Sequence, residues 1–168
     1  DALRPRWLCR SPPCHASNHH RGNRACLTGS IFMNSFVLHR QLAKDTALIG
    51  RTSDCLLLLM KDARYPWLIL VPEQEGLREM HDLSDERFSR VSQTIKRLSL
   101  GLQKLTEAPK INIAALGNMV PQLHIHIIAR REEDASWPGP VWGVGAAKAY
   151  TDDELRVLVA SLQEALLD

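Results

Sequence analysis

Gln122, His124 and His126 occupy alternate positions of one short segment, Gln122-Leu-His-Ile-His-Ile127, and are the residues best suited to chemistry. Successive side chains of a β-strand point to opposite faces, so these three would form a row with neighbours about 6.5–7 Å apart. An imidazole with an ordinary pKa of about 6.5 is mostly neutral at pH 7, and it can serve as a nucleophile, a proton carrier or a metal ligand. The alternation alone is equally compatible with a solvent-exposed strand face that happens to be rich in histidine.

Several apolar segments predict the sheet that would hold this row. Two strongly apolar runs, at 54–60 and 67–71, flank a polar turn that ends at Pro66, which indicates an antiparallel hairpin. Shorter apolar stretches and the alternating segment predict further strands at 36–38, 46–50, 110–115 and 120–129.

Two helices are expected to complete the domain. After a capping residue at Ser84, apolar residues recur at spacings of three and four from Phe88 to Leu105, which predicts a helix with one apolar face. Thr151-Asp-Asp-Glu154 is a capping box that starts a final helix. The predicted fold class is α+β: an antiparallel sheet of about five strands, with one long helix packed on it and a C-terminal helix.

Composition divides the 168 residues into an extension, residues 1–34, and a domain, residues 35–168. The extension has five arginines, one aspartate and no apolar period, which predicts a disordered or non-native segment upstream of a natural start at Met33. With 16 basic and 18 acidic residues, the domain has no nucleic-acid-binding stripe, and its apolar runs are too short to span a bilayer. Its lone Cys55 indicates a reduced, buried thiol and hence a cytoplasmic protein.

The segment Gly117-Asn-Met-Val-Pro-Gln-Leu-His-Ile-His-Ile-Ile-Ala-Arg130 resembles the motif of the histidine triad (HIT) family. That motif reads Gly-Gln-Ser/Thr-Val-x-His-φ-His-φ-His-φ-φ, in which φ is apolar. The resemblance extends more loosely over about residues 36–131, and its details look like a bacterial subgroup similar to diadenosine tetraphosphate hydrolases. It implies a HIT-like fold, a homodimer, a nucleotide substrate and no cofactor.

The resemblance also implies a mechanism. His124 corresponds to the family's nucleophile, which attacks the α-phosphate of a dinucleoside polyphosphate or nucleoside phosphoramidate and forms a nucleotidyl-histidine intermediate. His126 corresponds to the histidine that contacts the phosphate and the leaving group, and Gln122 to the first member of the triad. The substrate-binding positions that it implies are Asn112, Gly117, Asn118 and Val120.

Two departures from the motif leave the chemistry open. Gln122 replaces the first histidine, and Met119 replaces a hydroxyl residue. If the first position only orients the nucleophile, Gln122 suffices; if it must carry a proton, activity falls, because an amide does not titrate. Two other functions are therefore considered: a nucleotide-binding module with little or no catalysis, and a metal site formed by His124 and His126.

Overall fold

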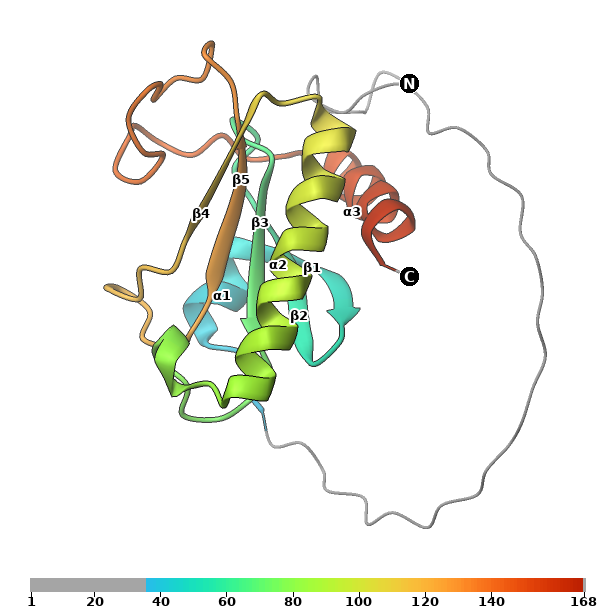
Figure 1. The fold of residues 1–168 in the computed structure, drawn as a ribbon. Coiled ribbons are helices and arrows are strands. Elements are labelled where there is room, and N and C mark those ends of the chain that lie inside the picture. Colours follow the sequence, from blue (N-terminus) through green and yellow to red (C-terminus); the bar gives the residue numbers. More distant parts are fainter. Residues whose placement is uncertain (1–35, 168) are drawn as a thin grey trace, which may run out of the picture.

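The computed structural model describes residues 36–167, so the predicted extension at 1–34 lies outside the described residues. Five antiparallel strands form one sheet, as the sequence predicts, and their order is β1-β2-β3-β5-β4 (Figure 1). The strands are β1 (Thr46–Thr52), β2 (Cys55–Met60), β3 (Trp67–Pro72), β4 (Lys110–Ala114) and β5 (Ile125–Arg130), and the helices are α1 (Arg40–Asp45), the 3-10 helix η1 (Met80–Asp82), α2 (Asp85–Thr106) and α3 (Asp152–Leu166). None of the helices in the described range is long and apolar enough to cross a membrane.

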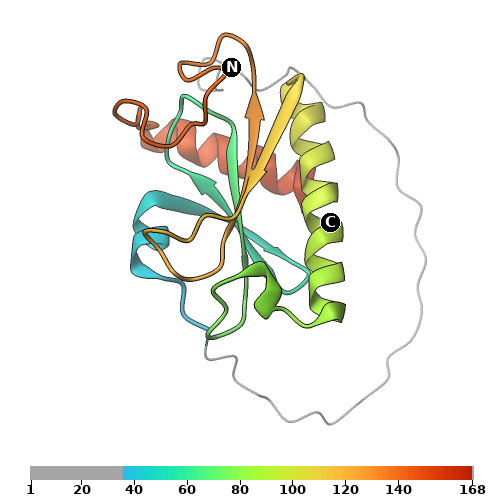
Figure 2. The same cartoon turned by 60° about the vertical axis from the view of Figure 1, so that its left-hand side comes forward.

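The two long helices cover one face of the sheet (Figures 1 and 2). Ser84 caps α2 by accepting a hydrogen bond from the backbone N–H of Arg87, and Thr151 and Glu154 form the predicted capping box of α3. The apolar stripes of both helices meet inward-facing strand residues in one buried core, which includes Leu57, Leu68, Val91, Leu98, Leu102, Ile125, Ile127, Leu158 and Leu162. Burying such side chains supplies the main driving force for folding.

A second core lies on the opposite face of the sheet. The segment that contains α1 and the loop after β5 cover it, and it includes Leu42, Leu56, Leu58, Tyr65, Trp67, Ile69, Val71, Val120, Ile128 and Val141. The sheet is therefore buried on both faces, which explains why β2 and β3 are continuously apolar rather than alternating.

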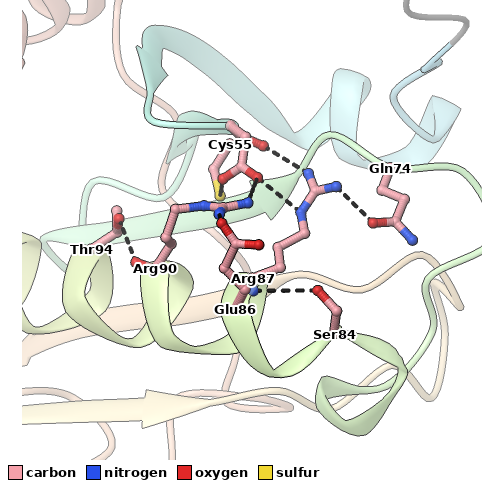
Figure 3. Close-up of polar contacts among 8 residues, drawn as sticks. Cys55, Gln74, Ser84, Glu86, Arg87, Arg90 and Thr94 are labelled. Carbon is pink, nitrogen blue, oxygen red and sulfur yellow. Dashed lines mark hydrogen bonds and ion pairs between the residues drawn. The ribbon is translucent and has the colours of Figure 1, made fainter.

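Ion pairs connect the start of α2 to the turn between β1 and β2 (Figure 3). The Asp54 carboxylate contacts Arg87 at 3.0 Å and Arg90 at 3.4 Å. Next to it, Cys55 is a free, fully buried cysteine, as predicted. Burial, with help from the Asp54 charge, raises the pKa of its thiol to about 12, so the thiol stays protonated.

Two elements differ from those predicted. Residues 36–39 form no strand, and the short helix α1 follows them. The strand predicted at 120–129 begins only at Ile125, because the pairing of β4 with β5 ends at His126 and Pro121 has no backbone N–H to donate. The preceding residues leave the sheet, and the backbone N–H of Leu123 bonds the carbonyl oxygen of Leu77 instead. His124 therefore stands just before the strand, and His126 stands within it.

Candidate active site

His124 and His126 lie side by side on the sheet face opposite α2. Their ring centroids are 4.9 Å apart and the ring planes are nearly perpendicular, at 79°. The two residues are only 7% and 4% exposed, so an exposed, incidentally histidine-rich face is excluded. The residues that alternate with them, Leu123, Ile125 and Ile127, lie in the helix-covered core, so the predicted alternation of faces is confirmed even where the backbone is not in the sheet.

Hydrogen bonds give the two rings opposite tautomers. His124 Nδ1 lies 2.7 Å from the carbonyl oxygen of Gln122, which can only accept, so Nδ1 carries the proton and Nε2 a lone pair. Trp67 Nε1–H donates to His126 Nδ1 at 3.0 Å, so in neutral His126 the proton is on Nε2. The site thus presents one nucleophilic nitrogen and, from the neighbouring ring, one N–H donor.

The surroundings keep both rings neutral. Burial lowers the pKa of His124 below its ordinary value, although the hydrogen bond with Gln122 opposes this, and the charge of His39 lowers it further. Burial, and to a lesser degree His124, lower the pKa of His126 to about 3. Near neutral pH, neither ring is protonated, and the lone pair on His124 is available for attack.

The depressed pKa of His126 predicts a loss of stability in acid. In the unfolded chain His126 takes up a proton near pH 6.5, whereas in the folded chain it does so only near pH 3. Between pH 6.5 and pH 3 the unfolded state therefore binds more protons, and the free energy of unfolding falls as the pH decreases. His126→Asn offers an amide oxygen for the bond from Trp67 and does not titrate. We expect its Tm to fall less steeply between pH 6.5 and 4 than that of the wild type. The exposed His81→Asn is the control, and equal slopes for His126→Asn and the wild type would contradict the assignment.

The side-chain amide of Gln122 forms two hydrogen bonds with the backbone of the segment before α1. Its Nε2 donates to the carbonyl oxygen of Val37, and its Oε1 accepts from the backbone N–H of His39, each at 2.9 Å. Its own backbone carbonyl accepts the bond from His124. One residue therefore orients the His124 ring and holds residues 37–39 beside the site.

The other predicted positions are spread around this centre. Gly117 has a φ of +68°, which favours glycine, in the loop between β4 and β5, and Asn118 beside it is exposed. Val120 is buried in the core on the histidine face. Asn112 stands on β4, and its amide oxygen accepts a hydrogen bond of 2.8 Å from Arg130. The structure thus brings Val120 to the histidine face and ties Asn112 to a buried guanidinium.

Sequence reasoning missed Trp67 as a site residue and His39 as a neighbour of Gln122. Trp67 could have been found from strand parity, since it lies two residues before Ile69, which pairs with His126. The ring of Trp142, from the loop after β5, also packs on His126, with centroids 5.3 Å apart. No sequence signal links His39 to the row, because α1 and its capping residue were not predicted.

A cleft of about 430 Å³ adjoins the histidine pair. Trp67 and Trp142 line it and also contact His126, and Met60 adds another apolar wall. Charged side chains also line the cleft, namely Lys44, Asp45, Lys61, Asp62 and Arg64, of which Arg64 and Asp62 form an ion pair at 2.7 Å. The cleft therefore offers aromatic and apolar surface for a ring and positive charge for an anion.

Comparisons with known proteins agree on one family. The model of the HIT domain family matches residues 41–133. A histidine triad protein of solved structure from Sinorhizobium meliloti 1021 is 44% identical over 80% of this chain and 99% of its own, with a TM-score of 0.77. Another, from Marinobacter aquaeolei VT8, is 45% identical over 78% of this chain and 96% of its own, with a TM-score of 0.76. A search of curated proteins finds no match. The residue pattern, the five-stranded fold and these similarities together show that the chain belongs to the HIT domain family.

Proposed function

We propose that the protein is a nucleotide hydrolase or nucleotidyl transferase that cleaves at the α-phosphate of a dinucleoside polyphosphate or a nucleoside phosphoramidate. The observation that carries the proposal is the pair of opposite tautomers, a lone pair on His124 Nε2 and an N–H on His126 Nε2, on rings whose centroids lie 4.9 Å apart. Attack on phosphorus needs a neutral nucleophile and a donor for the charge that develops, and these two rings supply both.

The reaction proceeds in two displacements. The lone pair of His124 Nε2 forms a bond to the α-phosphorus, and the bond from phosphorus to the leaving group breaks. His126 Nε2–H donates to the phosphate or to the departing atom. The positive charge that appears on His124 is stabilised by its Nδ1–H bond to the carbonyl of Gln122. An amine leaving group takes its proton from solvent. Water or another acceptor then attacks phosphorus and releases its proton to solvent, the phosphorus–nitrogen bond breaks, and His124 becomes neutral again.

The remaining predicted residues complete the proposed substrate site. The loop residues Gly117 and Asn118 contact phosphate oxygens, with Asn112 and Val120 forming the adjoining wall. The cleft beside His126 accepts the nucleoside, because its tryptophans and Met60 can pack on a base while its two lysines attract phosphate charge. All these groups belong to the chain, so the proposed reaction uses no cofactor.

A homodimer in the cytoplasm is part of the same proposal. β4 is an edge strand of the sheet, and Ile113 on it is 52% exposed. Leu116 and Met119, in the loop that follows, are 42% and 92% exposed. An apolar sheet edge of this kind favours pairing with a second copy. The protonated, unpaired Cys55 fits a reducing compartment.

Intact-protein mass spectrometry tests the reaction directly. The protein is mixed with diadenosine tetraphosphate, or with adenosine 5′-phosphoramidate, quenched in alkali within seconds and weighed. We expect a nucleotidyl adduct on the intact protein, which digestion locates on the peptide that contains His124, together with release of a mononucleotide. A binding module with Gln122 and Met119 in place of the family residues would bind nucleotide without adduct or turnover.

The alternative function, a metal site formed by His124 and His126, has a separate test. Among residues 36–167, no group of three or more His, Cys, Asp or Glu side chains could hold a metal ion. In neutral His126, moreover, one nitrogen accepts from Trp67 and the other bears a proton. Elemental analysis of the wild type and His124→Asn decides the matter, because a structural metal would be stoichiometric in the first and lost in the second.

A further inference from the structure

His39 is a histidine that the motif does not include, yet the chain holds it beside the motif. Gln122 binds the backbone on both sides of Leu38, at Val37 and at His39 itself. The same Gln122 binds His124 through its backbone carbonyl. His39 is half-buried, and it lies near enough that a positive charge on it would lower the pKa of His124. One glutamine thus connects His39 to the proposed nucleophile.

The tautomer of His39 is defined by its place at the start of α1. Its Nδ1 accepts the backbone N–H of Gln41 at 3.2 Å and caps the helix. A ring that accepts at Nδ1 carries its proton, when neutral, on Nε2. His39 therefore presents an N–H donor at the end of the ring that points away from the capping bond.

We infer that His39 is the third histidine of the site, donating its Nε2–H to the substrate phosphate, and that Gln122 is the positioning residue that holds it there. The inference rests on the proposed function and deepens it. Gln122 stands where the family motif has its first histidine, and it holds in place His39, a histidine from another segment of the chain. His39, His124 and His126 do not form a group that could hold one metal ion, but a phosphate offers several oxygens to donors that approach from different sides.

This role for Gln122 changes what its substitution should do. The family pattern alone suggests that Gln122→His keeps or raises turnover. The structure suggests a loss, because an imidazole does not reproduce the paired donor and acceptor that hold Val37 and His39. Gln122→Glu is more selective: it still accepts from His39 but places a carboxylate oxygen against the carbonyl of Val37. Both variants are expected to lower turnover about tenfold or more while the His124 adduct still forms.

Two substitutions of His39 separate catalysis from helix capping. His39→Asn keeps an oxygen near the Nδ1 position, and asparagine is among the best capping residues, but it has no donor near Nε2. His39→Gln places an amide N–H near Nε2 and weakens the cap. We measure Tm, kcat and KM with diadenosine tetraphosphate, and Kd for AMP and GMP by calorimetry. The same two substitutions at the exposed His81 are the controls.

We expect His39→Asn to lower kcat roughly 10- to 100-fold with an unchanged Tm, and His39→Gln to stay within about threefold of the wild type. The opposite order, with His39→Gln the weaker enzyme and the less stable protein, would show that His39 only caps α1 and would overturn the inference while leaving the proposed function intact. So would wild-type turnover in both variants.

The nucleotide affinities decide the inference even without turnover. If the wild type forms no adduct but binds AMP or GMP, the proposed catalysis fails. The inference then stands if His39→Asn weakens binding about tenfold and His39→Gln does not, and falls if both bind like the wild type. If the wild type binds neither nucleotide, both proposals are wrong.

Discussion

Replacing His124 with asparagine is expected to lower kcat by about three orders of magnitude or more, which corresponds to about 4 kcal/mol of transition-state stabilisation. The amide N–H of asparagine can reproduce the bond that His124 Nδ1 makes to the carbonyl of Gln122. The variant therefore removes the nucleophilic Nε2 while it retains the local structure. Stopped-flow or discontinuous assays with diadenosine tetraphosphate measure kcat, and the nucleotidyl adduct should disappear.

The matched control for this prediction is His126→Asn. It keeps an acceptor for Trp67 and removes the N–H that the reaction uses for charge stabilisation. We expect a smaller loss of kcat than in His124→Asn, because water can partly replace a phosphate contact, and we expect the adduct to persist. The affinity for AMP should change much less than kcat in the His124 variant. Near-normal turnover by His124→Asn would refute covalent catalysis at this position.

The sequence predicts those parts of the fold that depend on local patterns. The two apolar runs identify β2 and β3, and the three- and four-residue spacing identifies α2 with its cap at Ser84. Alternation places the two histidines on one face and the intervening apolar residues on the other. In each of these cases, the side chains that fix the element are close together in the sequence, so the pattern is visible before any tertiary contact is known.

The site is less predictable because contacts between distant residues complete it. Gln122 bonds to backbone atoms 83 and 85 residues earlier, and Trp67 bonds to a histidine 59 residues later. Neither bond has a local signature. The tautomer of His126 depends on the bond from Trp67, so the motif alone cannot say which of its nitrogens carries the proton. The motif also does not reveal that His39 belongs near the site.

Arg130 illustrates the same limit and supports a second prediction of large effect. At the end of an apolar strand, its sequence position suggests contact with either phosphate or water, but the side chain is only 1% exposed. Its Nε donates to Asp134 at 2.8 Å, and its two terminal nitrogens donate to Asn112, Ser136 and the carbonyl oxygen of Gly139. The guanidinium thus joins β4 and β5 to the loop after β5, the loop that carries Trp142 to the histidines.

Arg130→Met is therefore expected to lower the free energy of unfolding by about 3–5 kcal/mol, because it leaves the Asp134 carboxylate, whose side chain is only 9% exposed, without its cation. Urea denaturation followed by circular dichroism measures the change. The exposed Arg156→Met, whose ion pair with Asp153 lies in solvent, should change stability by about 0.5 kcal/mol or less. The double variant Arg130→Met, Asp134→Asn should recover part of the loss, since the unpaired charge is gone. If the single variant is as stable as the wild type, Arg130 does not hold the loop, and the packing of Trp142 on His126 must be maintained by the loop's other contacts.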